Sequence, residues 1–562
     1  MFVCPHGGAD SNPGTIGEPV ASLPAAQALA RGALAKATAP TTLHVRLCPS
    51  LHRLTATLNF SDADNPGGAH DVRWAADGRG GATISAGQDI VGWQPKQGAP
   101  NGVFEAPTPP GLHFFRQLWA SGRRQSRPVT SEVDGKCGNG EDFEGCSEVR
   151  LPDGSTMNLQ MNVSAPTAGY TSDSTAPLHW RNPNEVEFNF ARAGTEWTEA
   201  RCTVANVTAE GSGSRIVLQE LCFSRTFAAR FDKGNQLLPR RIENVMSANL
   251  SGRAARAEAL ALDQFYVDRE TKTVLLRTAS LEAPLATTVV GFQGPMILGN
   301  VSGLSFSNIS FQFGGGWLQV NGPHGLAQFQ AGFYPRPDLK KAGTWRLPGA
   351  CVMWGEMGNC WKNLLALPAA IHFVASQRIS FRSCAFSHMG TAALWFDRGS
   401  RNCSVLDSVF DDNSGSALMI GGIEDRLQPD PALWTAGNSA TNSRITQAAA
   451  EYHDSPAVLI GWSADTTVSH CEIANVSYSG VSLGWGKQPV QQAPLLTGPL
   501  PHTNGAAFAG WGDQSYSRNN IIDHNEIHHV MCGDLVDGGS IYSLGHNPGG
   551  GYTHNYIHHQ CR

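Results

Sequence analysis

RISFRSCAFSH, which begins at Arg378, is the first of five related stretches towards the C-terminus of the chain. The other copies are NCSVLDSVFDD from Asn402, DTTVSHCEIAN from Asp465, NNIIDHNEIHH from Asn519 and GYTHNYIHH from Gly551. Where no loop intervenes, the copies recur at intervals of roughly 23–30 residues, which is typical of solenoid proteins. The segment 370–562 therefore predicts a repeating fold.

Alignment of the copies gives columns of side chains with the same character. The first apolar column holds Phe381, Val405, Val468, Ile522 and Tyr552, and the second holds Phe386, Phe410, Ile473, Ile527 and Ile557. A column between them holds Cys384, Ser408, Cys471, Asn525 and Asn555, and a polar column follows with His388, Asp412, Asn475, His529 and His559. Because successive residues of a strand face opposite sides, each copy has an apolar face. Stacking the copies about 4.8 Å apart would bury that face in a continuous core.

A second strand recurs between the copies. It reads AIHFVA from Ala370, ALWF from Ala393, ALMIGG from Ala417, AVLIGW from Ala457, GVSLGW from Gly480 and SIYSLG from Ser540. Each turn thus has at least two strands, joined by corners rich in Gly, Asn, Ser and Asp. The pattern predicts an all-β parallel β-helix. The alternative is a β-sandwich with coincidental spacing, but sandwiches do not repeat residue identity by column.

Composition excludes several functions. The 562 residues carry a formal net charge of −6, which does not indicate binding to nucleic acid or to an acidic membrane surface. No apolar run reaches the roughly 20 residues that a membrane span requires. Charged residues are few, at 16%, and the 62 glycines suit a β-protein rich in turns.

The thirteen cysteines indicate an oxidising environment. Close spacing predicts disulfides between Cys137 and Cys146, between Cys202 and Cys222, and between Cys351 and Cys360. Cys384 and Cys471 fall in an inward column and are predicted to be buried free thiols. No CxxC occurs, so we expect no zinc site, and the sequence predicts no metal-binding residues and no cofactor.

Acceptor sequences for N-glycosylation also suggest secretion. They lie at Asn59, Asn162, Asn206, Asn249, Asn300, Asn308, Asn402 and Asn475, although corners of a β-helix favour Asn and Ser in any case. The N-terminus, MFVCPHGGADSNPG, has neither a basic nor an apolar region of a signal peptide. We expect an extracellular or secretory-pathway protein whose leader is absent from this sequence.

Three segments are expected along the chain. Residues 1–100 hold a cap helix and the first coils, residues 101–290 an inserted β-rich domain, and residues 291–562 the β-helix with long loops. Ser22 caps the helix LPAAQALARGALAKA, whose apolar stripe is Leu23, Ala26, Ala30, Ala33 and Leu34. FYVDRETKTVLL, from Phe265, predicts a hairpin inside the insert.

Several stretches resemble a known group of proteins. SNPGTIGEPVASLPAAQALARG from Ser11, ISAGQDIVGW from Ile84, VFEAPTPPGLHFFRQLWASGRR from Val103, VSYSGVSLGWG from Val476 and IHHVMCGDLVDGGSIYSLG from Ile527 carry the likeness. They resemble right-handed parallel β-helix proteins of the pectate-lyase-like superfamily, closest to family 141 glycoside hydrolases. The resemblance implies carbohydrate-active chemistry on plant cell-wall glycans. It also implies further coils with another acidic motif beyond Arg562, so we expect the chain to be truncated there.

Acidic residues gather at the corner that precedes the second strand of each coil. These corners are expected to stack along one edge, which brings together Asp411, Asp412, Glu451, His453, Asp454, Tyr478, His529, Asp534 and Asp537. The last corner is the longest and ends in Asp537-Gly538-Gly539, where glycines leave space beside the carboxylate. At any single corner an Asp can instead make only local turn hydrogen bonds.

Hydrolysis of a glycosidic bond needs two carboxyls, one to protonate the leaving oxygen and one to attack or to activate water. The predicted catalytic residues are Asp537, Asp412 and Asp454. The predicted substrate-binding residues are His453, Tyr478, Trp485, His529, Asp534 and Tyr542, with Trp462 as a further sugar platform. We therefore predict that the chain is a glycoside hydrolase acting on a plant or algal cell-wall polysaccharide. Its predicted partner is that polysaccharide or an oligosaccharide.

Two other functions fit the fold. A polysaccharide lyase would need Arg, Lys or Ca²⁺ to neutralise a uronate; the corners contain no Arg or Lys, although Asp411, Asp412 and Asp454 could form a calcium cluster. A non-catalytic adhesion or carbohydrate-binding solenoid would use the aromatic residues alone. The fold does not decide among the three.

Overall fold

The chain is described from a computed structural model. It describes all residues except 79, 131–147, 152–154, 163–167, 193–195, 221, 224–225, 227–237, 247–259, 285, 318–324, 329, 336–363, 424–427, 485–515, 545–546 and 562.

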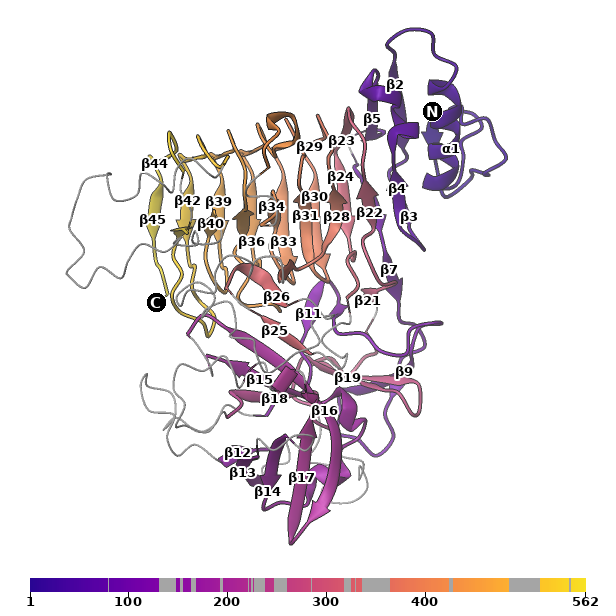
Figure 1. Cartoon of the computed structure of the whole chain (residues 1–562). Helices are drawn as coiled ribbons and strands as arrows, with labels where there is room; N and C mark the ends of the chain where they lie inside the picture. The colour runs from indigo at the N-terminus through magenta and orange to yellow at the C-terminus, as the bar shows by residue number, and fades with distance from the viewer. Residues whose placement is uncertain are drawn as a thin grey trace, which may run out of the picture.

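Three parallel sheets wind into a solenoid, which Figure 1 shows as stacked rungs running from purple to yellow. The first sheet has ten strands: β1 (Phe2–Val3), β2 (Thr42–Leu47), β5 (Asp71–Ala76), β23 (Leu304–Ser307), β29 (Ser380–Arg382), β32 (Ser404–Leu406), β35 (Ser439–Thr441), β38 (Thr467–Ser469), β41 (Ile521–Asp523) and β44 (Gly551–Thr553). The second has nine: β3 (Leu51–Arg53), β6 (Ala82–Ser85), β24 (Ile309–Gln312), β30 (Ala385–Met389), β33 (Val409–Asn413), β36 (Arg444–Thr446), β39 (Glu472–Ala474), β42 (Glu526–His528) and β45 (Tyr556–His558). The third has eight: β4 (Leu58–Phe60), β22 (Ile297–Gly299), β28 (Ala369–Phe373), β31 (Ala392–Phe396), β34 (Leu418–Ile420), β37 (Val458–Ile460), β40 (Val481–Leu483) and β43 (Ile541–Ser543). The predicted parallel β-helix is confirmed.

The predicted columns are neighbours in the sheets. Phe381 pairs with Val405 in the first sheet, and Phe386 pairs with Phe410 in the second, where the two rings stack 4.4 Å apart. Each repeat contains two strands rather than one, because a left-handed residue such as Ser383 (φ 53°) bends it in the middle. Each coil therefore has three strands, one more than the minimum expected.

The coil that contains β35 and β36 was not predicted from the sequence repeats. Ala440 of β35 pairs with Val405 on one side and with Val468 on the other, and Ile445 continues the second apolar column. The stretch ATNSRIT, from Ala440, has small residues at most of its inward positions, so its hydrophobic pattern is weak.

The polar column consists of left-handed corner residues. His388, Asp412, Asn475, His529 and His559 all have φ between 48° and 59°. Asn, Asp and His tolerate this conformation better than most side chains, which explains why the column is polar. The corner from the second sheet to the third sheet therefore begins at the same place in each coil.

A helix closes the N-terminal end of the solenoid. α1 (Leu23–Leu34) starts after Ser22, whose hydroxyl accepts a hydrogen bond from the backbone N–H of Ala25. Its buried face consists of Leu23, Ala26, Gln27, Ala30 and Leu34. The predicted stripe is right except at Ala33, which is exposed while Gln27 is buried. Gln27 is satisfied there because its amide donates to the carbonyl of Asn59.

Antiparallel strands, most of them inserted between β6 and β22 and a few between β24 and β28, lie below the solenoid in Figure 1. A sheet of eight contains β12 (Glu148–Arg150), β13 (Thr156–Asn162), β14 (Gly169–Ser172), β15 (Glu187–Ala191), β16 (Glu199–Glu210), β17 (Gly213–Leu218), β18 (Arg241–Glu243) and β25 (Leu326–Gln328). Two smaller sheets contain β7 (Gly87–Asp89), β10 (Leu118–Ala120), β11 (Arg123–Gln125) and β21 (Thr287–Val290), and β8 (Gln94–Pro95), β9 (Val103–Pro107), β19 (Gln264–Asp268) and β20 (Thr273–Arg277). β26 (Phe333–Pro335) and β27 (Leu364–Ala366) form a separate pair. The predicted hairpin is β19–β20, which is antiparallel.

Disulfides join Cys202 to Cys222, as predicted, and also Cys4 to Cys48 and Cys532 to Cys561. The thiols of Cys384 and Cys471 are free and buried in the core, as predicted, and so is that of Cys403. The predicted pairs Cys137–Cys146 and Cys351–Cys360 lie outside the described residues. Within the described part of the chain, no helix has the length and apolarity needed to cross a bilayer.

Candidate functional site

The corners between the second and third sheets form one continuous edge. Because the strands before and after each corner pair in register with those of the next coil, the corners stack above one another. The edge runs through residues 387–392, 411–416, 448–456, 474–480 and 528–540. The predicted stacking of the corners is therefore present.

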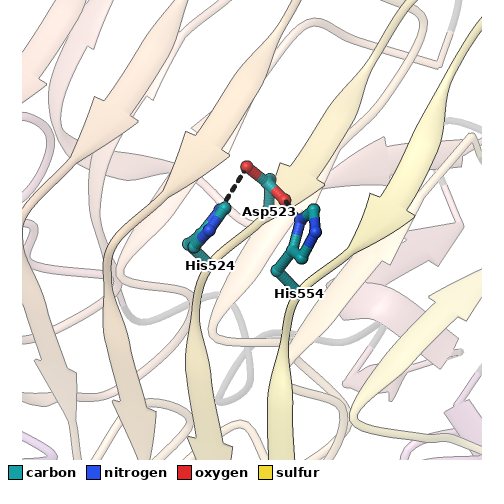
Figure 2. Close-up of side chains that lie close together, drawn as sticks. All are labelled: Asp523, His524 and His554. Atoms are coloured by element: carbon teal, nitrogen blue, oxygen red, sulfur yellow. Dashed lines mark hydrogen bonds and ion pairs between the residues drawn. The ribbon is translucent and has the colours of Figure 1, made fainter.

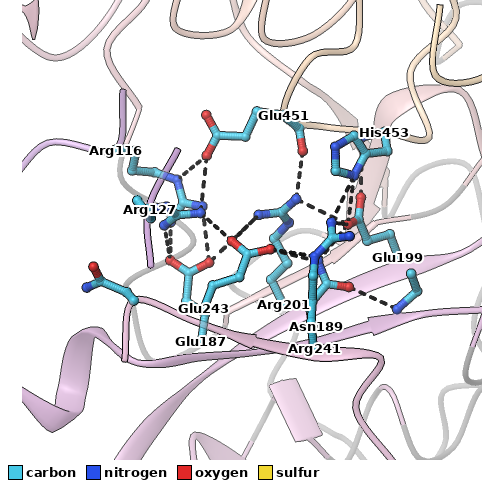
Figure 3. A network of polar contacts seen from close by, with 12 residues as sticks. Arg116, Arg127, Glu187, Asn189, Glu199, Arg201, Arg241, Glu243, Glu451 and His453 are labelled. Carbon is cyan, nitrogen blue, oxygen red and sulfur yellow. Dashed lines mark hydrogen bonds and ion pairs between the residues drawn. The ribbon is translucent and has the colours of Figure 1, made fainter. Parts of the chain in front are cut away.

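The inserted strands bring arginines to this edge. The insert contributes Arg116, Arg127, Arg201 and Arg241, which face the corner that holds Glu451 and His453 (Figure 3). Arg124 of the insert lies at the same place. The corners themselves contain no Arg or Lys, as noted from the sequence, and the arginines at the edge come from a distant segment. The arginines are spread from residue 116 to residue 241, and no sequence pattern connects them to the repeats.

Arg116 lies at the centre of the contact. Its guanidinium binds the Glu187 carboxylate and also donates from Nε to Oε1 of Glu451 at 2.9 Å. The Arg116 and Glu187 side chains have no exposed surface. Burial alone would raise the pKa of Glu451, but Arg116 and Arg127 outweigh that effect and hold the pKa below its ordinary value. Glu451 is thus a buried carboxylate that stays ionised.

The network continues towards the C-terminal coils. Arg201 lies 3.1 Å from Oε1 of Glu199, whose other neighbour at 3.1 Å is Nδ1 of His453. Burial opposes ionisation of Glu199, but Arg201 and His453 together hold its pKa well below the ordinary value. Arg241 connects this group to the last corner, since its Nη1 lies 3.0 Å from Oδ2 of Asp534.

A cavity of about 340 Å³ opens where the insert meets the edge. It is lined by Arg116, Arg124, Gln125, Ser126, Arg127, Val129, Arg201, Arg241, Glu243, Ala450, Glu451 and His453. Its volume is at the lower end of the range for small-molecule sites. Most of the lining side chains carry a charged or polar group, so the cavity suits a hydroxyl-rich or charged ligand better than an apolar one.

Asp412 joins the insert to the solenoid. Its carboxylate accepts hydrogen bonds from Nε1 of Trp119 at 2.5 Å and from Nε of Arg124 at 2.6 Å, and it is 7% exposed. The Arg124 guanidinium also lies over the Trp119 ring, 4.7 Å from its centroid. Both carboxylate oxygens are therefore occupied. Asp411 faces the other way and accepts from the Thr446 hydroxyl.

Asp454 is buried beneath the edge. It has no exposed surface; its Oδ2 accepts from the backbone N–H of Gly332 at 3.3 Å, and Oδ1 has no hydrogen-bond partner among the described residues. Burial, reinforced by the nearby charge of Glu199, raises the pKa of Asp454 well above its ordinary value. Asp454 does not line the cavity. In the described part of the chain, Asp411, Asp412 and Asp454 form no group that could hold a cation.

Asp537 is an exposed acid at the end of the last corner. Its backbone is left-handed, with φ 63°, and its carbonyl accepts a hydrogen bond from the Tyr478 hydroxyl at 2.7 Å. The Tyr542 hydroxyl donates to Oδ1 of Asp537 at 3.3 Å. Tyr478 is 1% exposed, so it fixes the position of the corner from below and is not a surface for sugar stacking.

The other predicted binding residues divide into two groups. His453 lines the cavity, and Asp534 forms an ion pair with Arg241, which also lines the cavity. Both predicted residues therefore lie at the site. His529 is exposed and stacks on His559, with ring centroids 5.2 Å apart, and it does not line the cavity. Trp462 is 2% exposed, and its indole donates to the carbonyl of Ile423. Trp485 lies outside the described residues.

Comparison with known proteins supports the fold. No family model and no curated protein matches the chain. A solved structure titled "Glycoside hydrolase" has a TM-score of 0.72 and 20% identity, covering 100% of this chain and 88% of that chain. A complex of XylC with xylose scores 0.40 at 8% identity over 99% of this chain and 69% of that one. A tailspike of Acinetobacter baumannii bacteriophage AP22 with capsular saccharide scores 0.19 at 8% identity, covering 90% and 64%. The chain thus has the parallel β-helix fold of a solved glycoside hydrolase.

Proposed function

We propose that this chain is a glycoside hydrolase whose saccharide substrate lies along the edge between the corners and the insert. The observation that carries the proposal is the polar cavity at that edge, lined by Glu451, Glu243 and His453. Beyond the cavity, the same edge continues through the ion pair of Arg241 with Asp534 to the exposed Asp537. The whole-length similarity to a solved glycoside hydrolase supports the same reaction class.

Asp537 is proposed as the carboxyl that acts on the scissile bond. It is exposed, and its oxygen accepts a hydrogen bond from the Tyr542 hydroxyl. Backbone contacts with Tyr478 fix the position of the corner, which catalysis needs in order to hold the carboxyl at one distance from the substrate. Tyr542 would orient the carboxyl and offer its ring to the sugar.

Glu451 is the favoured partner carboxylate. Asp412 and Asp454 were the partners expected from the sequence, but neither of them lines the cavity. Glu451 lines the cavity and is kept ionised by its arginines, as a nucleophile or a base must be. We assign supporting roles to Asp412 and Asp454, which hold the insert and the floor of the site.

The arginines do not by themselves favour a lyase. Arg124 is engaged by Asp412, Arg116 by Glu187 and Glu451, and Arg201 by Glu199. Neutralising a substrate uronate would require one of these pairs to open. The experiment below distinguishes a hydrolase from a lyase and from a non-catalytic binding protein.

The test is reducing-end release from fucosylated glycans, xylan and pectic polysaccharides. We expect the parent chain to depolymerise one of these cell-wall glycans by hydrolysis. Asp537→Asn should lose at least a hundredfold in turnover, the order expected for an acid–base group, and retain glycan binding in affinity electrophoresis. Asp411→Asn, at another corner of the same edge but bonded to Thr446, is the matched control and should keep full turnover.

Three outcomes would overturn the proposal. An Asp537→Asn variant with parental turnover would remove the proposed catalytic role. Products that carry the ultraviolet absorbance of an unsaturated uronide would show a lyase. Glycan binding without bond cleavage by the parent chain would leave only a binding function.

We propose an extracellular location on the basis of the three disulfides, which persist in oxidising compartments. The acceptor residues Asn59, Asn300, Asn308, Asn402 and Asn475 are all exposed. Expression through a secretory pathway followed by glycosidase treatment tests this, and a mobility shift is expected. An unshifted, fully reduced product would argue against secretion.

A further inference from the structure

Two histidines and an aspartate converge on the outer surface of the last two coils. Asp523 ends β41, His524 follows it, and His554 occupies the equivalent position one coil later, after β44 (Figure 2). Nδ1 of His524 lies 2.6 Å from Oδ2 of Asp523, and Nδ1 of His554 lies 3.0 Å from Oδ1. One ligand atom from each of the three residues lies within 4.8 Å of the others.

The backbone sets this arrangement. His524 and His554 are both left-handed, with φ 53° and 52°, so their rings leave the corner in the same direction. The rings stack with centroids 4.5 Å apart, close to the spacing of neighbouring strands. The carboxylate lies beside both rings because Asp523 immediately precedes one of them on the strand end.

The carboxylate is what distinguishes this place from the rest of the column. His470 stacks on the other side of His524, at 5.0 Å, but the residue before it is Ser469. In the next coil the residue before His554 is Thr553, whose hydroxyl donates to Oδ1 of Asp523 at 2.6 Å. That hydroxyl orients the carboxylate in the way that outer contacts orient metal ligands.

We propose that Asp523, His524 and His554 bind a divalent transition-metal ion of the Zn²⁺ class and thereby fasten the last two coils together. Two imidazole nitrogens and one carboxylate oxygen suit Zn²⁺, Cu²⁺ or Ni²⁺ better than Ca²⁺ or Mg²⁺, which prefer oxygen alone. A tetrahedral ion with bonds of about 2.0–2.1 Å needs ligand atoms about 3.3 Å apart, which requires only small rotations here. Water would fill the remaining position.

Binding requires the two Nδ1 atoms to present lone pairs. In the neutral ring the proton then sits on Nε2. Both rings can carry it there at little cost, because the His524 and His554 side chains are 48% and 68% exposed and water can accept the hydrogen bond. The expectation of no zinc site rested on the absence of CxxC, which does not bear on ligands contributed by two coils.

Calorimetric titration of Zn²⁺ into the chelator-treated full chain tests the proposal. Asp523→Asn and His554→Ala should each bind one equivalent fewer than the parent chain. His470→Ala, which removes a stacked ring without a carboxylate, should bind as many as the parent. Glu526, His528 and His558 form a neighbouring group, so the loss on substitution is the readout and not the total number of ions.

Thermal melting provides a second readout. Zn²⁺ should raise the melting temperature of the parent and of His470→Ala by more than that of Asp523→Asn, while Ca²⁺ should change none of them. All variants should melt alike in chelator, because the substituted side chains are on the surface. Equal Zn²⁺ stoichiometry in the parent, Asp523→Asn and His554→Ala would overturn the proposal, as would an equal loss in His470→Ala.

Discussion

Arg116 is buried together with the carboxylate groups that it contacts, Glu187 and Glu451. Removing charges from water is costly, and the pairs recover the cost only while each charge keeps its partners. The arrangement contributes less to net stability than an apolar core of equal size would. It does fix one orientation of the insert against the edge, because a shifted insert would leave charges unpaired.

Arg116→Ala should destabilise the chain by about 3–5 kcal/mol, because it leaves the buried carboxylates of Glu187 and Glu451 without their shared partner. Urea denaturation measured with tryptophan fluorescence checks this. Arg46→Ala is the control; it breaks the ion pair with Asp77, in which the side chains are 49% and 36% exposed, and should change the midpoint little. Equal effects of the two substitutions would contradict the account of the buried network.

Asp454 should make stability depend on pH in the direction opposite to Glu199 and Glu451. Its folded-state pKa is raised, so its favourable contribution is complete below the unfolded pKa of about 3.9 and is lost as pH rises towards the folded pKa. Across that window the loss is about 1.4 kcal/mol per pH unit.

Asp454→Asn stays neutral and should not show this loss. The melting temperature of the variant minus that of the parent should therefore grow as the pH is raised from 4. Glu451 and Glu199 act with the opposite sign in both proteins, because their lowered pKa values add stability above the unfolded pKa, and they cancel in the difference. A difference that is constant with pH would contradict a raised pKa at Asp454.

At the scale of elements, a ladder of polar side chains stabilises the bend within each repeat. Oδ1 of Asn525 accepts from the backbone N–H of Cys471 at 2.9 Å, and its Nδ2 donates to the carbonyl of Val468 at 2.9 Å. Asn555 does the same for Asn525 one coil later. The column that looked like mixed Cys, Ser and Asn in the sequence is therefore a column of inward corner residues.

Asn525→Ala should cost about 1–3 kcal/mol, because it leaves the buried N–H of Cys471 and the carbonyl of Val468 unpaired. The change is measured as a shift in the urea midpoint. Arg444→Ala on β36 is the control, since that side chain is exposed on the outer face of the solenoid. An Asn525→Ala protein as stable as the control would mean that water replaces the ladder.

The repeats could be predicted because one strand face must be apolar in every coil. Phe386 above Phe410 and Ile473 above Ile527 share residue types, so the columns are visible in the sequence. The coil around Ala440 was missed because its inward side chain is small. The left-handed corners were visible only as a polar column, without the bend that they impose.

At the scale of the whole molecule, the site depends on contacts between distant parts of the chain. Arg116 and Glu451 are 335 residues apart, and Arg124 and Asp412 are 288 apart. No periodicity connects an insert to the solenoid on which it packs, so the acidic edge could be predicted and its arginines could not. Burial of Asp454 was likewise hidden, since a corner position alone does not reveal what covers it.

The central claim is that the corners and the insert together form one saccharide site. Hydrogen–deuterium exchange of the Asp537→Asn chain tests it most directly, with and without oligosaccharides released from the polysaccharide that the parent chain cleaves. We predict slower exchange on binding in 448–454, 528–540 and 239–243, with no change in the first sheet. Protection confined to the first sheet, or absent from both corners, would contradict the claim.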